Sequence, residues 1–224
     1  MANTISPFGF RSFGQREGSA PTAGQERLFI NSSDTNTYFT GDLVYLSSTP
    51  AGAGGQNFPA AISLSSQSGF PAGVFNGCKY YSPTVGRTVW NNYFPGSVGS
   101  SNVCEAFVMT NPQQLFLAQC STTSGVCGTS NIGMNIATAS SLQISGNILS
   151  GQSQAMLASS NVGFMASSAA YPPGSALANW KVVDVYANSA PPGVNGTSSG
   201  AEGGAILIVS PGNWSRNIVT TAST

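Results

Sequence analysis

The densest run of strand-forming side chains lies between Gly73 and Gln119. Aromatic and β-branched residues occur there in short apolar lengths. Four turn dipeptides separate these lengths: Asn76-Gly77, Ser82-Pro83, Pro95-Gly96 and Asn111-Pro112. Short apolar lengths between turn dipeptides are typical of antiparallel sheet. We therefore expect this stretch to form the central sheet of an all-β protein.

Weaker strand patterns lie on both sides of this stretch. Before it, apolar runs predict strands at residues 28–30, 38–39, 43–46 and 60–64. After it, period-two alternation predicts strand within 132–144, and residues 180–186 form the clearest late strand pattern. Residues 205–209 are apolar on both faces, which indicates a central, covered strand. Residues 147–157 fit either strand or a short helix, and their Ser, Gly and Asn content disfavours the helix.

The first 25 residues show neither helix nor strand periodicity, yet they contain three phenylalanines within six positions. Disordered tails are normally poor in aromatic residues. We therefore predict an extended arm that docks on a partner protein; the alternative is a tail lying loosely on its own domain. The predicted contact residues are Pro7, Phe8, Phe10, Arg11, Phe13 and Arg16.

The chain has 224 residues, enough for one sizeable core or two small domains. We expect an antiparallel β-sandwich or barrel with the N-terminal arm and long Ser/Gly-rich loops. The body is predicted to span residues 26–224 as a single unit, and a subdivision near 121–175 is left open.

Charge is scarce, which limits the classes of partner. The chain has seven Lys and Arg, seven Asp and Glu and no histidine, and no charged residue lies between Ala106 and Trp180. Scattered basic residues do not form the positive stripe that nucleic acid or an anionic membrane requires. Lys79 and Arg87 beside Trp90 resemble a base-stacking surface, but we interpret them as the core and rim of a hairpin. A neutral surface favours association with other proteins.

The residue types needed for catalysis are largely missing. Without histidine, a Ser or Cys nucleophile lacks its usual base, and no phosphate-binding or nucleophile-elbow motif occurs. Glu105 and Asp184 are the two carboxylates within strong strand patterns, and alternation turns both toward solvent. Asp34 and Asp42 are too sparse for a calcium loop. We predict no enzymatic activity, no metal and no cofactor.

Four cysteines are present, Cys78, Cys104, Cys120 and Cys127, and none forms a C-x-x-C pair. The simplest interpretation is buried free thiols. The alternative is a disulfide that closes the short loop between Cys120 and Cys127 in oxidising surroundings. Four cysteines allow three pairings, and the sequence alone does not choose among them.

Neither a signal peptide nor a membrane helix is expected. Residues 1–25 lack an apolar signal core, and the most apolar run, residues 205–209, is only as long as a strand. We expect synthesis in the cytoplasm and no membrane partner.

Four segments resemble a known family. These are Met1-Ala2-Asn3 with Pro-Phe-Gly-Phe-Arg at 7–11, then GVFNGCKYY at 73–81, RTVWNNYFPG at 87–96 and AFVMTNPQQLFLAQ at 106–119. Together they resemble head decoration, or cement, proteins of tailed bacteriophages over about a third of the chain. The resemblance implies a virion protein on the outer capsid surface, often a trimer, that binds the major capsid protein and locks neighbouring subunits together.

Two other functions are compatible with the sequence. One is a carbohydrate-binding module on a virion, with Trp180 and Trp214 as candidate stacking residues and Trp90 and Tyr93 as further exposed aromatics. The other is a different structural subunit of a phage head or tail.

Overall fold

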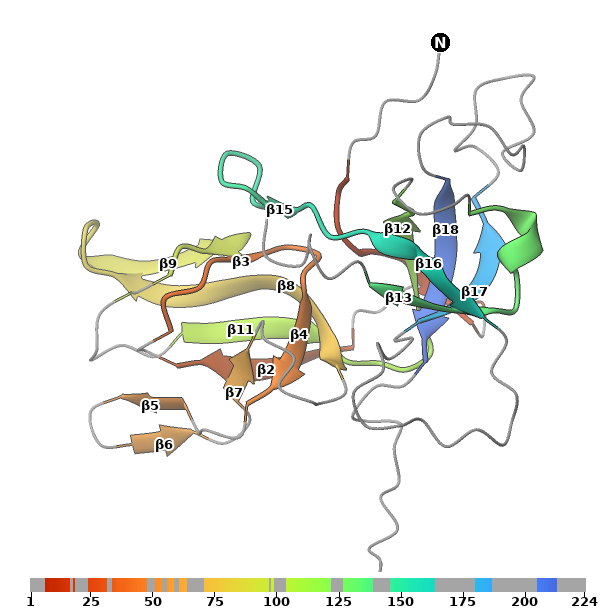
Figure 1. The fold of residues 1–224 in the computed structure, drawn as a ribbon. Helices are drawn as coiled ribbons and strands as arrows, with labels where there is room; N and C mark the ends of the chain where they lie inside the picture. The colour runs from red at the N-terminus through yellow and green to blue at the C-terminus, as the bar shows by residue number, and fades with distance from the viewer. Residues whose placement is uncertain are drawn as a thin grey trace, which may run out of the picture.

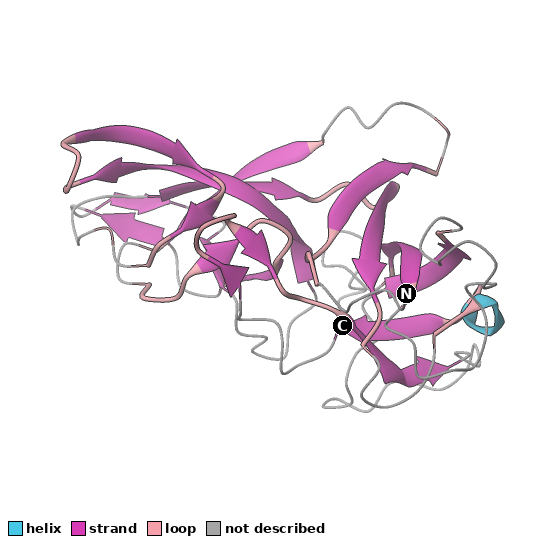
Figure 2. Ribbon diagram, turned by 90° about the horizontal axis from the view of Figure 1, so that it is seen from above, coloured by secondary structure: helices cyan, strands magenta, loops and turns pink. Residues whose placement is uncertain are grey.

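The structure is a computed structural model. It describes residues 7–16, 18, 24–31, 34–47, 51–53, 56–58, 61–63, 71–96, 98, 104–121, 127–138, 146–163, 180–186 and 205–212. Within these ranges the chain is all-β and mainly antiparallel, as predicted, with a single 3-10 turn at Thr129–Asn131 (Figures 1 and 2). Among the same residues, no helix has the length and apolar character needed to span a membrane.

Five strands close into a small barrel, because their pairings form a ring. β8 pairs with β4 on one side and with β11 on the other, and β11 leads back to β4 through β2 and β7. β9 extends the barrel by pairing with the second half of β8. The strands are β2 (Gln25–Ile30), β4 (Leu43–Leu46), β7 (Ala61–Ser63), β8 (Pro71–Ser82), β9 (Arg87–Asn91) and β11 (Cys104–Met109).

The second sheet, here called the C-terminal sheet, is antiparallel throughout and has the order β1-β12-β18-β17-β13-β16. Its strands are β1 (Arg11–Gln15), β12 (Gln114–Gln119), β13 (Asn135–Thr138), β16 (Leu157–Gly163), β17 (Trp180–Val185) and β18 (Ile206–Pro211). β18 lies between β12 and β17, which confirms the central strand predicted at 205–209.

Three two-stranded pairs complete the described fold. They are β3 (Tyr38–Phe39) with β10 (Tyr93–Phe94), β5 (Ala51–Ala53) with β6 (Gln56–Phe58), and β14 (Gly146–Asn147) with β15 (Gln152–Ser153). The β14–β15 hairpin replaces the alternative helix at 147–157. Asn147 fixes its turn, because the Oδ1 atom accepts a hydrogen bond from the Leu149 amide at 2.9 Å.

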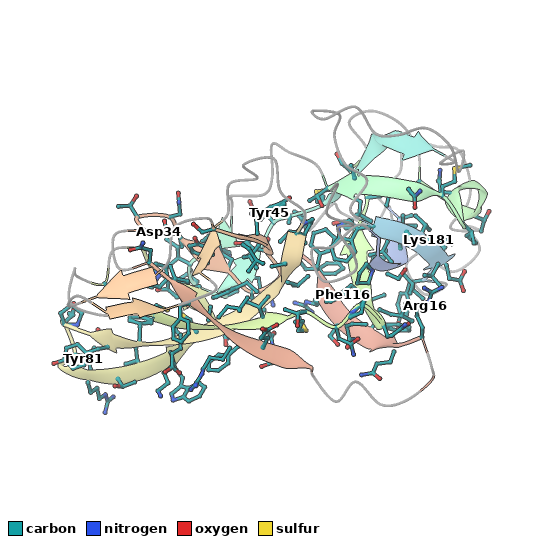
Figure 3. All side chains as sticks on the ribbon, turned by 90° about the horizontal axis from the view of Figure 1, so that it is seen from below. Arg16, Asp34, Tyr45, Tyr81, Phe116 and Lys181 are labelled. Carbon is teal, nitrogen blue, oxygen red and sulfur yellow. A yellow bond between two sulfur atoms is a disulfide. The ribbon has the colours of Figure 1, made fainter. Side chains whose placement is uncertain are left out.

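The buried side chains form two clusters. One fills the barrel around Leu28, Phe75 and Phe94. The other joins the barrel to the C-terminal sheet, since it contains Tyr45 from β4 and Phe116 from β12, which lie where the two sheets meet (Figure 3). Burial of large apolar side chains therefore holds both sheets together.

Two of the predicted turn dipeptides connect strands, and a third lies within a strand. Ser82-Pro83 opens the predicted β8–β9 turn, and Asn111-Pro112 carries the chain from β11 in the barrel to β12 in the C-terminal sheet. Asn76-Gly77, predicted as a turn, lies instead inside β8. The register with β11 shifts there, and Gly77 has a φ of 118°. The extra residue is absorbed as a β-bulge, for which a glycine at positive φ is also suited.

Residues 11–15 of the predicted arm form β1 of the C-terminal sheet, so this part of the arm is a strand of the body. Phe10 is wrongly predicted as a contact residue, whereas partner contacts by Arg11 and Phe13 stay a prediction. β1 is an edge strand paired with β12. Phe10 is buried and stacks on Trp180 with ring centroids 4.3 Å apart, so it cannot contact a partner. Burial of the two stacked rings removes apolar surface from water and so stabilises the folded protein.

Trp180 was predicted to be a glycan-stacking residue, and this prediction is also wrong. Its side chain is fully buried, and its indole N–H donates a hydrogen bond to the Thr138 hydroxyl at 3.0 Å. Neither the ring nor its N–H group is therefore available to a glycan. Trp214 lies outside the described residues.

Of the two interpretations of the cysteines, the disulfide holds for one pair and the buried free thiols hold for the other. Cys120 and Cys127 form a disulfide, whereas Cys78 and Cys104 are free thiols in the barrel core. We expect a thiol-specific reagent without reductant to find two reactive thiols in the unfolded protein and almost none in the native one, because burial blocks access. Four reactive thiols after unfolding would contradict the disulfide.

Candidate binding surfaces

Four side chains form a row across the outside of the barrel. Phe29 on β2 lies opposite Glu105 on β11, Glu105 lies opposite Lys79 on β8, and Lys79 lies opposite Trp90 on β9. We call this set the Trp90 row. The alternate residues on these strands, including Leu28, Cys104 and Cys78, are buried in the barrel. Because side chains alternate along a strand, the Trp90 row points outward.

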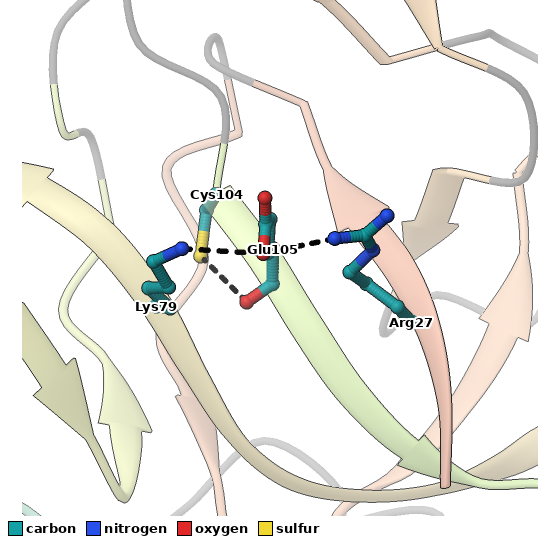
Figure 4. A network of polar contacts seen from close by, with 4 residues as sticks. All are labelled: Arg27, Lys79, Cys104 and Glu105. Atoms are coloured by element: carbon teal, nitrogen blue, oxygen red, sulfur yellow. Dashed lines mark hydrogen bonds and ion pairs between the residues drawn. The ribbon is translucent and has the colours of Figure 1, made fainter.

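Glu105 is held between two cations. Its Oε2 atom lies 3.8 Å from the Lys79 ammonium nitrogen and 3.8 Å from Arg27 Nη1 (Figure 4). These groups are partly or largely exposed, so the ion pairs add little to stability. The ion pairs nevertheless place three charged groups near one another on a protein with few charged residues.

Trp90 is the most exposed aromatic side chain of the described residues, at 70%. Its ring is parallel to that of Phe107 within 4°, with centroids 5.1 Å apart, and the Lys79 ammonium lies 5.6 Å from its centre. Phe107 is on the other side of β8, opposite the bulge that contains Gly77. The Trp90 ring therefore leans across β8 onto Phe107. One ring face is supported and the residue as a whole stays accessible.

A second row lies on the outer face of the C-terminal sheet. Arg11, Leu117, Ile208 and Asp184 are neighbours across β1, β12, β18 and β17. Leu117 and Ile208 are half-buried, while the residues on either side of them belong to the core. This row, here called the Leu117 row, has an apolar centre with a charge of opposite sign at each end.

The predicted arm residues are divided by the fold. Arg11, Phe13 and Arg16 are exposed at the edge of the C-terminal sheet, and Phe13 packs edge-on against Tyr186 with centroids 5.9 Å apart. Pro7 and Phe8 are half-buried, and the Arg11 guanidinium lies 5.2 Å above the Phe8 ring.

A cavity of about 340 Å³ lies beside the N-terminal segment. It is lined by Phe8, Phe10, Arg11, Ser12, Thr40, Asn76, Met109 and Gln152. Among the lining residues that the structure describes, Arg11 is the charged one.

Asp42 is the described carboxyl group with the most unusual surroundings. It is fully buried; Oδ2 accepts a hydrogen bond from the Phe39 amide at 2.7 Å, and Oδ1 has no hydrogen bond from the described residues. Burial raises the pKa of Asp42 from 3.8 to about 7, against the lowering effect of hydrogen bonds from Ser153 and the Phe39 backbone. Burial disfavours the charged form of an acid.

Among the described residues, the acidic residues Glu105, Asp184 and Asp34 do not come together in one site. Glu105 and Asp184 are on different sheets and reach solvent, as alternation predicts. Asp34 accepts hydrogen bonds from its neighbours Asn36 and Tyr38. Within the described ranges, no three His, Cys, Asp or Glu residues come together in a way that could hold a metal ion.

Two interpretations of Trp90 follow from the sequence, the core and rim of a hairpin or an exposed aromatic residue, and the structure shows Trp90 exposed. Its neighbour Val89 packs against the barrel core. In a period-two strand, an inward Val89 requires an outward Trp90. That signal was present in the sequence, but the burial of Val89 had to be known to use it.

No family model, curated protein or solved structure matches this chain.

Proposed function

We propose that the protein is a non-enzymatic structural component of a tailed-phage virion that binds the outside of the assembled capsid and stabilises it. The sequence resemblance at 7–11, 73–81, 87–96 and 106–119 supplies the class of protein. The observation that carries the proposal is the Leu117 row on the outer face of the C-terminal sheet, beside exposed Phe13.

The Leu117 row suits contact with a protein. Protein interfaces combine an apolar, charge-depleted centre with a polar rim. Leu117 and Ile208 supply such a centre, and Arg11 and Asp184 supply rim charges of opposite sign. Phe13 adds an exposed ring at the sheet edge. The partner in this proposal is the major capsid protein of the same phage.

A homotrimer is part of the proposal, because one small face binds weakly. Three copies joined together convert three weak contacts into one strong attachment, since later contacts form at a high effective concentration. Attachment at symmetric positions of a capsid has this multivalent geometry.

The test is binding of the full-length protein to purified, undecorated capsids, measured by co-sedimentation. Phe13→Ala is expected to weaken binding about tenfold, a typical loss for an aromatic residue that makes a strong interface contact. Trp90→Ala is the matched control, because it removes an exposed ring on β9, which lies toward the other end of the molecule from β17 and β18 (Figure 1), and it should leave capsid binding unchanged.

Normal capsid binding by Phe13→Ala and by a second variant, Leu117→Asn, would overturn the placement of the interface. Failure of the wild-type protein to bind capsids would overturn the proposed function. Recovery of the protein with isolated tails would support instead the alternative of a tail subunit.

A further inference from the structure

We propose that the Trp90 row binds a pyranose ring of a polysaccharide. This is a second binding function, independent of the capsid contact on the C-terminal sheet. The two surfaces are well separated: β9 lies toward one end of the molecule, whereas β17 and β18 lie toward the other (Figure 1).

The aromatic part of the site is prepared for stacking. Trp90 is 70% exposed, yet its orientation is fixed by the parallel contact with Phe107. A ring that is already ordered loses little conformational freedom when a ligand covers it. A pyranose presents C–H groups on its flat face, and these pack on the negative face of an indole.

The polar part of the site matches sugar hydroxyls. A hydroxyl both donates and accepts hydrogen bonds. Lys79 and Arg27 offer donors, and Glu105 offers an acceptor between them. A sugar stacked on Trp90 would therefore meet donors and an acceptor grouped on the same face of the barrel.

The arrangement of the row distinguishes a glycan from other macromolecules. In the row, the charged residues Glu105 and Lys79 lie between the aromatic residues Phe29 and Trp90, whereas protein interface centres are depleted of charge. Two cations opposed by one carboxylate are too few for the phosphate backbone of nucleic acid. A carbohydrate, which presents both C–H faces and hydroxyl groups, fits a surface that combines an exposed aromatic ring with charged groups.

The experiment applies the full-length protein to an array of bacterial surface oligosaccharides and then titrates the strongest ligand by calorimetry. Trp90→Ala is expected to lower affinity at least about tenfold, the loss typical of an aromatic residue that dominates a contact. Trp90→Phe should retain part of the binding, and Glu105→Gln should lower it several-fold. Phe13→Ala is the control and should bind the glycan normally.

Two outcomes would overturn the inference. One is that no glycan binds, or that Trp90→Ala binds as well as the wild type. The other is that Trp90→Ala loses capsid binding, which would make this face a protein contact. Melting curves check the fold of each variant, and the exposure of Trp90 predicts no change. Because capsid binding is measured with Phe13→Ala, failure of the glycan site and failure of the proposed function give different results.

Discussion

Replacing Phe10 with alanine is expected to destabilise the protein by about 3–5 kcal/mol, the range for a buried phenylalanine truncated to alanine. The ring is 1% exposed and stacks on Trp180, which in turn packs edge-on against Phe116 with centroids 5.4 Å apart. Removal of Phe10 therefore opens a cavity in the cluster that joins the two sheets. Urea unfolding followed by tryptophan fluorescence measures the change.

The control for this prediction is Phe13→Ala, three residues along the same segment. Phe13 is 43% exposed, so its loss should cost well under half as much. If the two variants were equally stable, and Phe10→Ala alone lost capsid binding, the segment would be a docking arm after all. The comparison therefore separates structural from partner-binding roles within β1.

Replacing Asp42 with asparagine is expected to stabilise the protein at pH 8 and to change little at pH 4. The folded-state pKa of Asp42, about 7, is above the unfolded value of 3.8, so the folded protein binds the proton more tightly. Stability therefore falls as the pH rises from about 4 to 7, and the full penalty applies above pH 7. At 1.36 kcal/mol per pKa unit, the penalty is about 4 kcal/mol at most.

Asparagine removes this charge and keeps a carbonyl oxygen that can accept the hydrogen bond from the Phe39 amide. Melting temperatures of wild type and variant between pH 4 and 8 measure the effect, with Asp184→Asn as an exposed control. A wild-type profile that runs parallel to that of Asp42→Asn over the whole range would contradict the prediction.

Local patterns predicted individual strands well because alternation and turn chemistry act over a few residues. The runs at 43–46 and 180–186 correspond to β4 and β17 within one residue. The partners of these strands depend on distant residues. Nothing near Asn111-Pro112 indicates that the chain passes from one sheet to another there, and Asn76-Gly77 suits a bulge as well as a turn.

The candidate surfaces were less predictable than the strands, because exposure of an aromatic residue depends on what packs against it. Phe10 and Trp180 are good stacking residues by type, and each is buried by the other. Trp90 lies in a segment rich in core residues, yet it is exposed because Val89 takes the inward position. Contacts with residues distant in sequence decide whether such an aromatic side chain is buried, and residue type alone does not.

The order of strands in the C-terminal sheet has a consequence for biosynthesis. β12 pairs with β1 on one side and with β18 on the other, so its two neighbours come from opposite ends of the described chain. The barrel strands are complete once Met109 has been translated, but the second sheet must wait for Pro211. Pairings so distant in sequence form slowly. Until they form, β1 has no finished sheet to join, and nascent chains are most exposed to aggregation and proteolysis in this interval.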